Sequence, residues 1–445
     1  MSVELVEAPI GEFINFRNGK TSPDRSEVGE IAVFGSNGII GYCDKSNAEE
    51  GSLIVGRVGS YCGSVYHSQD KCWVTDNAII GTPIHKEEAD FWFFLLKKLD
   101  LNSFRAGSGQ PLLNQGILNS IRVQIPNCTK TRELIGKHLM LFDDKIELNR
   151  QINQTLEQIA QAIFKSWFVD FEPVKAKIEA KAAGSDPEHA AMFAISGKSE
   201  PELDQLSPKQ YQQLAATAAL FPDELVESGL GLIPEGWVAS PLGDYLDVLE
   251  TGRRPKGGVG AFSEGIPSVG AESINGVGNF DYSKTKYIPS AFFEKMKSGL
   301  VEDYDVLLYK DGGKPGDFKP RVSLFGEGFP FETFAINEHV FRMRSIRLGQ
   351  PFLYFQLGYE RVLADLRHRG AKAAIPGVNQ GDVNSLNFLV PEEKVTEKYN
   401  ETCGSLLKKI LVGANEMQTL ATLRDTLLPK LLSGEISVGD CECQA

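Results

Sequence analysis

Glycine stands beside basic or amide residues in five short phrases of the 445-residue sequence. Glycine lets a backbone approach a phosphate closely, Arg and Lys bind phosphate or guanine, and Asn and Gln can pair with adenine. The phrases are therefore candidates for contact with DNA. The alternative is that they are ordinary strand connections with solvated charges. The five phrases are GSNG at 35–38, GRVGSY at 56–61, AGSGQ at 106–110, YKDGGK at 309–314 and RHRGAK at 367–372.

Two denser basic clusters, at 253–256 and 314–321, add candidates for phosphate contact, although solvated surface charge explains such clusters equally well. The complete set of candidate DNA-binding residues consists of Lys20, Ser36, Asn37, Arg57, Ser60, Tyr61, Arg105, Gln110, Arg253, Arg254, Lys256, Lys310, Lys314, Lys319, Arg321, Arg367, Arg369 and Lys372.

The net charge of −13 argues at first against a polyanionic ligand. Its distribution weakens that objection, because residues 170–235 contain 12 acidic and 5 basic residues while residues 237–391 contain 18 of each. Binding to a polyanion depends on the local potential and not on the sum. The composition therefore allows a basic face beside an acidic segment.

Sequence signatures of catalysis are missing. There is no phosphate-binding loop, nucleophile elbow, metalloprotease helix or adenine-methylation motif, so we expect a non-catalytic chain. The seven cysteines include no CxxC pair, and Cys62, His67 and Cys72 are spaced only loosely like metal ligands, so we assign no metal site. The N-terminus is acidic and no apolar run could span a bilayer, which predicts a cytoplasmic location.

Two long helices are predicted at 131–168 and 397–432, and they must position these phrases. Each has a mostly apolar seam at the spacing of a coiled coil, and an offset of 264 residues relates the two seams. We expect the helices to pair along the seams; the alternative is that each packs on its own domain. The proposed pairing residues are Ile135, Leu139, Phe142, Ile146, Asn149, Asn153, Leu156, Ile163 and Trp167, with Tyr399, Leu406, Ile410, Met417, Leu420, Leu427 and Leu431.

The repeat extends beyond the helices. The phrase from Pro111 to Pro126 returns at 376–391, and the opening at Pro9 returns at Pro241 with an offset of 232, so the second copy contains about 33 extra residues. We predict a tandem duplication of an α/β domain followed by a long helix. Predicted strands are 31–34, 52–55, 74–80, 121–125, 305–309, 321–325, 340–343 and 386–390; predicted domain helices are 91–99 and 352–366. Residues 174–236 are interpreted as a semi-ordered acidic insertion with helical signal at 208–220.

The phrases GSNGIIGY, GRVGSYCGSV, GSGQPLLNQG, LNRQINQTLEQIAQAIFKSWFVDFEPV, GLIPEGW, INEHVFR and LRDTLLPKLLSGEI resemble the specificity (S) subunit of type I restriction–modification systems over essentially the whole chain. The resemblance implies an α/β (α+β) fold: two target-recognition domains in tandem, separated by two long helices packed as an antiparallel coiled coil. The implied divisions are target-recognition domains at 1–126 and 237–391, spacer helices at 127–173 and 392–436, an acidic linker at 174–236 and a tail at 437–445.

The same resemblance implies a function: reading a bipartite double-stranded DNA target, one domain to each half-site. It implies two methyltransferase (M) subunits, which bring S-adenosylmethionine, and restriction (R) subunits, which bring ATP and Mg-dependent cleavage, with no cofactor on this chain. Two other classes stay open from the residues alone. One is a protein adaptor with duplicated interaction domains and no DNA binding, and the other is an enzyme, such as a stand-alone methyltransferase, with an unrecognised site.

Overall fold

The computed structural model describes residues 4–105, 112–312, 318–371 and 376–437. The chain divides into two compact units. Unit 1 comprises Met1–Glu147 and Gln418–Ala445, and unit 2 comprises Leu148–Met417. Each long helix is therefore shared by both units, whereas the sequence prediction assigned the helices to segments of their own.

Unit 1 contains three antiparallel or mixed sheets: β2-β8-β5-β6, β4-β3-β7 and the pair β1-β9. Helix α1 packs its apolar residues on them, with Phe91, Trp92 and Phe94 in the main core. The elements are β1 Leu5–Pro9, β2 Ile14–Asn18, β3 Ile31–Gly35, β4 Gly38–Cys43, β5 Ser52–Gly56, β6 Val65–Ser68, β7 Trp73–Val74, β8 Ala78–Pro83, α1 Ala89–Lys98, α2 Gln115–Ser120, β9 Arg122–Pro126 and the start of α3 Thr129–Phe168.

Unit 2 repeats this topology with sheets β13-β20-β17-β18-β15, β16-β14-β19 and β12-β21. The repeat includes the parallel pairing of β3 with β7, which returns as β14 with β19. The strands are β10 Leu225–Ser228, β11 Gly231–Pro234, β12 Val238–Pro241, β13 Val248–Thr251, β14 Ile266–Val269, β15 Gly276–Val277, β16 Lys286–Ile288, β17 Val306–Tyr309, β18 Val322–Leu324, β19 Ala335–Ile336, β20 Val340–Arg344 and β21 Asn387–Val390. The predicted duplication of an α/β domain is confirmed.

The helices of unit 2 include an addition with no counterpart in unit 1. Helices α4 to α7 follow α3 and enclose a small core of Ala191, Met192, Leu203 and Ala218. The segment predicted to be semi-ordered is therefore regular, because these apolar residues have a surface of their own to bury. The helices are α4 Glu172–Ala183, α5 Pro187–Ser196, α6 Glu200–Asp204, α7 Pro208–Ala218, α8 Ser290–Phe293, α9 Gln350–Gly358, α10 Glu360–Gly370, α11 Gln380–Asn384 and α12 Glu393–Leu432.

The repeated sequence phrases turn out to pack against each other. A Cβ atom on Gly11 would lie 2.9 Å from the side chain of Asn119, and one on Gly243 would lie 2.9 Å from that of Asn384. These glycines open the two domains and these asparagines close them. The repetition in sequence thus records a shared packing contact within each domain.

Two predicted elements are broken in the structure. The predicted strand 74–80 is interrupted between β7 and β8 by a turn in which the amide of Ala78 donates to the carbonyl of Thr75 at 3.0 Å. This turn carries the chain from one sheet to the next. The predicted helix 352–366 is two helices, α9 and α10, because Tyr359 between them has an extended backbone (ψ 134°). The other predicted strands and helices match observed elements to within a few residues.

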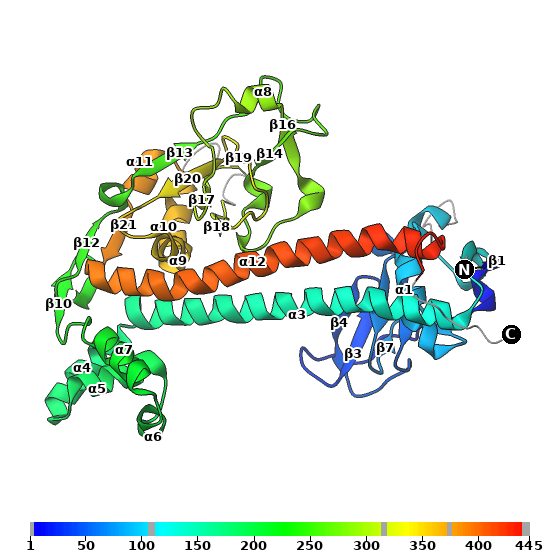
Figure 1. Ribbon diagram of the computed structural model, residues 1–445, viewed down its shortest axis with the longest axis horizontal. Helices are drawn as coiled ribbons and strands as arrows, with labels where there is room; N and C mark the ends of the chain where they lie inside the picture. Colours follow the sequence, from blue (N-terminus) through cyan, green and yellow to red (C-terminus); the bar gives the residue numbers. More distant parts are fainter. Residues whose placement is uncertain (1–3, 106–111, 313–317, 372–375, 438–445) are drawn as a thin grey trace. The chain divides into compact units, whose positions relative to one another are not determined.

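The long helices run antiparallel within each unit. In unit 1 the first part of α3 lies beside the last part of α12, drawn cyan and red in Figure 1, and Asp143 pairs with Arg424. In unit 2, Asn149 contacts Glu416 and Asn153 contacts Ile410, so positions fall along α12 as they rise along α3. The predicted fold class, α/β domains in tandem with two long paired helices, is confirmed.

Candidate nucleic-acid interface

Arg57, which directly follows the interior strand β5 of unit 1, is hydrogen-bonded at both its amide and its carbonyl. Strand β5 is buried at all five positions because β8 and β6 flank it. Arg57 comes next: its amide donates to the carbonyl of Asn77 at 3.1 Å, and its carbonyl accepts from the amide of Leu113 at 3.1 Å. The backbone of Arg57 is therefore a fixed base for its side chain.

Unit 2 holds Lys310 in the same way. Lys310 follows the buried interior strand β17. Its amide donates to the carbonyl of His339 at 3.0 Å, and its carbonyl accepts from the amide of Val378 at 2.7 Å. The strand register agrees, since the residue before Arg57 faces the first residue of β8 and the residue before Lys310 faces the first residue of β20. Arg57 and Lys310 therefore occupy equivalent backbone positions.

A second basic residue lies at equivalent positions near the first. Gly19 and Lys20 directly follow β2, and Gly252 and Arg253 directly follow β13. A Cβ on Gly19 would lie 2.0 Å from a backbone oxygen of the turn after β7, and one on Gly252 would lie 1.6 Å from the carbonyl oxygen of the last residue of β19. Only glycine fits there, and each glycine brings an exposed cation to the sheet edge.

Polar side chains complete the edge in unit 1. The hydroxyl of Ser36 donates to the carbonyl of Asn77 at 2.6 Å, the same carbonyl that accepts from the Arg57 amide. The hydroxyl of Ser64 lies 2.6 Å from the Ser36 carbonyl and 2.7 Å from that of Tyr61. These bonds join three loops into one surface. We call it edge 1, and its candidate residues are Lys20, Ser36, Asn37, Arg57, Ser60 and Tyr61.

The guanidinium of Arg57 is only partly satisfied. Its Nη1 lies 3.5 Å from the carbonyl of Asp76, a long contact. Its Nε is shielded from solvent and has no hydrogen-bond partner among the described residues. A shielded donor without a partner is costly, so edge 1 presents a positively charged group whose hydrogen bonds are incomplete.

Ion pairs engage two of the cations on the corresponding edge in unit 2. Lys310 Nζ lies 2.5 Å from an Asp311 carboxylate oxygen, and the other oxygen lies 2.5 Å from His339 Nδ1. Glu338 lies 3.5 Å from the other ring nitrogen of His339 and 2.5 Å from Arg254 Nε. We call this surface edge 2; it comprises Arg253, Arg254, Lys310, Asp311, Glu338 and His339.

Edge 2 is hollowed beside Lys310. A pocket of about 670 Å³ is lined by Thr251, Lys310, Asp311, Phe341 and residues 377–381. The Lys310 ammonium lies 5.6 Å from the centre of the Phe341 ring, a cation–π contact. Edge 2 therefore combines a concave surface with paired donors and acceptors.

Two predicted DNA-binding residues have structural partners on α10. Arg369 makes two 2.9 Å bonds to the Asp365 carboxylate and one of 2.7 Å to the Ser385 hydroxyl. The Arg369 guanidinium holds the pKa of Asp365 below its ordinary value. Arg367 lies 3.4 Å from Glu360. Arg369 is thus occupied in joining α10 to the loop after α11, and Arg367 has an acidic neighbour.

Of the remaining candidates, Arg321 has contacts with Ala271 and Tyr309, and three others are exposed. Arg321 donates to the carbonyl of Ala271 at 2.7 Å and lies over the ring of Tyr309 at 5.0 Å, next to Lys310 in the chain. Arg105, Lys256 and Lys319 are exposed. Gln110, Lys314 and Lys372 lie outside the described residues.

The helix seam of unit 1 is buried near the start of α3 and the end of α12. Ile135, Leu139 and Leu431 are at most 4% exposed and share one core with Leu428 and Leu432. The remaining predicted pairing residues of this unit, Phe142, Ile146, Leu420 and Leu427, are half-buried. Leu428 and Leu432 lie one position beyond the predicted seam.

The helix seam of unit 2 contains two buried amides. Asn149 donates to Glu416 at 2.8 Å and Asn153 to the carbonyl of Ile410 at 2.9 Å. A Cβ on Gly413 would lie 2.7 Å from the Asn153 side chain, so this glycine makes room for the amide. Of the other predicted residues, Trp167, Tyr399 and Ile410 are buried, and Leu156, Ile163, Leu406 and Met417 are half-buried.

The sequence prediction missed the acidic members of edge 2. Asp311 is adjacent to Lys310 in a phrase that was selected for its basic residues, so its proximity to Lys310 was visible in the sequence. Its link to His339 was not visible, because the two residues are 28 positions apart. It also missed Leu407, Leu411 and Ala414 on α12, which are buried toward the core of unit 2. Helix α12 faces both α3 and its own domain, so its apolar stripe is wider than one seam.

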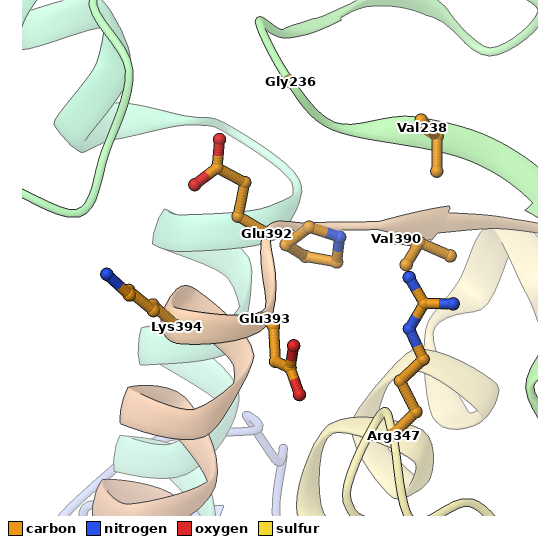
Figure 2. A pocket seen from close by; sticks show the side chains of 8 residues that line it. Gly236, Val238, Arg347, Val390, Glu392, Glu393 and Lys394 are labelled. Atoms are coloured by element: carbon orange, nitrogen blue, oxygen red, sulfur yellow. The ribbon is translucent and has the colours of Figure 1, made fainter.

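A second hollow, of about 440 Å³, lies where β21 leads into α12 (Figure 2). Figure 2 shows Arg347 and Glu393 on one side of the chain and Glu392 and Lys394 on the other. Its lining contains no predicted candidate residue. Among the residues that the structure describes, no group of three or more His, Cys, Asp or Glu side chains is arranged to hold a metal ion. Within the same residues, no helix is both long and apolar enough for a membrane span.

The sequence is similar to known specificity subunits of type I restriction enzymes. Residues 3–158 match the model of the type I restriction modification DNA specificity domain. The type I restriction enzyme HindI specificity subunit of Haemophilus influenzae is 32% identical over 351 residues, which cover 73% of this chain and 71% of that protein. The MjaIX specificity subunit of Methanocaldococcus jannaschii is 22% identical over 354 residues, covering 79% and 69%.

A solved structure has a similar fold. The type I restriction–modification S subunit from M. genitalium superposes with a TM-score of 0.59 at 14% sequence identity, covering 97% of this chain and 96% of that one. At this identity the likeness concerns the fold alone.

Proposed function

The chain belongs to the specificity subunits of type I restriction–modification systems, and from this premise we propose that it reads a bipartite DNA target, one domain for each half-site. The observation that carries the proposal is the pair of equivalent basic positions, Arg57 with Lys20 in unit 1 and Lys310 with Arg253 in unit 2. Two domains built alike, each with cations on the same sheet edge, suit two half-sites on one duplex.

Each edge supplies the two kinds of contact that sequence-specific binding needs. Exposed Lys20 and Arg253 suit phosphate, which positions the protein without reading sequence. Side chains held on a fixed backbone, Arg57 and Lys310, suit base edges in the major groove. The total charge of −13 does not oppose this, because the acids concentrate in the helical addition after α3.

In this proposal the chain is a non-catalytic subunit. Methylation of adenine would be performed by two M subunits that hold S-adenosylmethionine, and cleavage by R subunits that use ATP and Mg. The role of this chain is to place those enzymes on one DNA sequence. Its own residues supply affinity, orientation and sequence selection.

The long helices offer a surface for the M subunits. On α3, Leu148, Ile152 and Ile159 are 50%, 45% and 44% exposed, spaced four and seven residues apart on one face of the helix. The sequence offset of 264 relates Leu148 to Val412 and Ile159 to Leu423, which are 50% and 46% exposed on α12. Exposed apolar residues at repeated helical spacing favour docking of apolar partner helices. Related exposed apolar positions on the two helices agree with two copies of one partner.

The proposal is tested by mapping N6-methyladenine across the host genome with the gene intact and deleted, while the M subunit is expressed. We expect one bipartite motif with a fixed gap to lose its methylation on deletion, and complementation to restore it. Unchanged methylation of every motif would contradict the proposal. Exchanging residues 10–121 should then alter one half of the motif only.

A companion experiment tests the role of the helices as a spacer. Inserting one helical turn after Asn153, with a compensating turn in the facing part of α12, should change the number of unread bases between the half-sites and leave both halves intact. A motif with the original gap would contradict the spacer role. Replacing four exposed residues at the same place without insertion is the matched control.

A further inference from the structure

We propose that Arg57 reads a guanine in the half-site of unit 1, and that Lys310 contacts the base at the corresponding position in the half-site of unit 2. The inference rests on the proposed function and makes it specific: it selects one reading residue in each domain from eighteen candidates. It derives from the equivalent backbone bonds of these two residues.

The first argument concerns position. Reading a base requires the donor to be in a defined place, because a hydrogen bond weakens steeply with distance and angle. Arg57 and Lys310 are bonded at both the amide and the carbonyl, directly after a buried strand. Both side chains are also only partly exposed, so little conformational freedom remains to be lost on binding.

The second argument separates these residues from the other candidates nearby. Lys20 and Arg253 are exposed, and a mobile cation serves a phosphate well because phosphate contact demands charge more than geometry. Arg369 already uses its donors on Asp365 and Ser385. Arg57 is the basic residue of edge 1 whose backbone is hydrogen-bonded at both groups and whose guanidinium has incomplete hydrogen bonds among the described residues.

The third argument assigns the base. An arginine fork donates two parallel hydrogen bonds to the O6 and N7 acceptors of guanine, the most frequent specific contact in the major groove. The guanidinium of Arg57 has one long bond to a carbonyl and no carboxylate partner among the described residues. Because Nε is shielded from solvent, the donors that can face a base with two acceptors are those of the two terminal nitrogens, Nη1 and Nη2.

The fourth argument concerns the difference between the edges. Lys310 has a single ammonium group and Asp311 already lies against it. Its three donors radiate from one nitrogen and Asp311 already engages that nitrogen, so it cannot form the planar fork, and the neighbouring carboxylate lowers the gain from any acceptor-rich base. Lys310 is therefore expected to discriminate less between bases than Arg57 does.

The test uses the complex of this chain with its M subunits and duplexes that carry the motif mapped in the host. Each guanine of the unit 1 half-site is replaced in turn by 7-deazaguanine, which lacks the N7 acceptor. For the wild-type complex we expect one position at which replacement weakens binding by roughly 5- to 150-fold, the range for a bidentate contact. The Arg57→Lys complex keeps the charge but not the planar fork, so it should bind the unmodified duplex more weakly and lose less than the wild type at that position.

The control variant is Arg122→Lys, the same substitution at an exposed arginine on β9 that pairs with Glu7. It should respond to 7-deazaguanine as the wild type does. Replacements in the unit 2 half-site should weaken Arg57→Lys and wild type equally, which shows that the variant complex is folded. If Arg57→Lys fails to bind any duplex, Arg57→Gln is measured in the same series.

Two results would overturn the inference. One is a half-site without guanine, and the other is an Arg57 variant that keeps the wild-type sensitivity at every position. Lys310→Met completes the design: it should weaken recognition in the other half-site only, by a smaller factor. A wild-type complex that does not distinguish the motif from a scrambled duplex speaks against the proposed function itself, which is a different outcome.

Discussion

Edge 1 and edge 2 hold their basic residues by equivalent backbone bonds, but only edge 2 pairs its cations with carboxylates among the described residues. Both place a basic residue after a buried strand and a glycine–cation pair beside it. In edge 1 the cation has no carboxylate partner among the described residues, whereas in edge 2 Asp311 and Glu338 pair with Lys310, His339 and Arg254. The comparison teaches that the fold fixes where a side chain begins, while substitutions at a few loop positions decide what it can recognise.

The shared backbone should respond alike in both units to the most disruptive change. Gly252→Ala places a Cβ 1.6 Å from a carbonyl oxygen, and Gly19→Ala one at 2.0 Å. We expect each to destabilise its unit by about 3 kcal/mol or more, because rigid backbone must move. Gly260→Ala, in the same loop as Gly252 but with open space around it, is the control. Thermal unfolding measures the effect, and two glycines of very different sensitivity would break the comparison.

Removing one carboxylate should make edge 2 resemble edge 1. Asp311→Asn frees the Lys310 ammonium, so we expect tighter non-specific DNA binding and a log–log salt dependence steeper by about 1, the value for one more phosphate contact. Titration of the M-containing complex at several salt concentrations gives the slope. Asp244→Asn, an exposed site between β12 and β13, should leave the slope unchanged. An unchanged slope in Asp311→Asn would mean that the ion pair with Asp311 does not keep Lys310 from contacting phosphate.

A hydroxyl specific to edge 1 should have a measurable effect there. Ser36→Ala removes the 2.6 Å bond to the carbonyl that also accepts from Arg57, and we expect a loss of about 1 kcal/mol in the free energy of unfolding. Ser60→Ala, exposed on the same edge, should change it by less than about 0.5 kcal/mol. Urea unfolding compares the two variants. Equal effects would mean that the hydrogen bond of Ser36 does not stabilise edge 1.

A buried histidine should give unit 1 a pH dependence of its own. His67 has both ring nitrogens shielded, with no hydrogen bond from either within the described part of the chain, and burial lowers its pKa despite the nearby Asp90. The unfolded chain then binds a proton near the ordinary value of 6.5 while the folded one does not, so stability is lost as pH falls below about 6.5. Asp90, whose pKa burial raises, opposes this only at lower pH. His67→Phe should flatten the stability profile between pH 7 and 5, and a profile as steep as that of the wild type would exclude this cause.

The sequence predicted the long helices well because their information is local. A seam such as Ile135 to Leu139 repeats every three or four residues, and the helix observed at Thr129–Phe168 begins two residues before the predicted one. The strands of the domains were harder to predict. The turn at 75–77 contains Asp76 and Asn77, which favour turns, but apolar residues flank it on both sides and the prediction continued the strand through it.

Only the local part of the candidate site could be predicted from the sequence. Glycine beside a base marked Arg57 and Lys310, yet the sequence offset between these two residues is 253, whereas that between the helices is 264. Insertions between the strands hide the equivalence. It emerges only from hydrogen bonds between segments 20 to 68 residues apart, such as those from Arg57 to Asn77 and from Val378 to Lys310.

The closing ribbons of the two domains have a consequence for how such chains evolve. Strand β1 enters the first domain antiparallel to β9, which leaves it, with Val6 facing Ile125; β12 and β21 do the same for the second, with Val238 facing Val390. The points where the chain enters and leaves each domain are therefore neighbours. The two domains have similar sequences at their entry points and similar sequences at their exit points. Recombination between these similar sequences can exchange a whole domain as a cassette while the helices keep their partners, so a new specificity can arise in one step from existing parts.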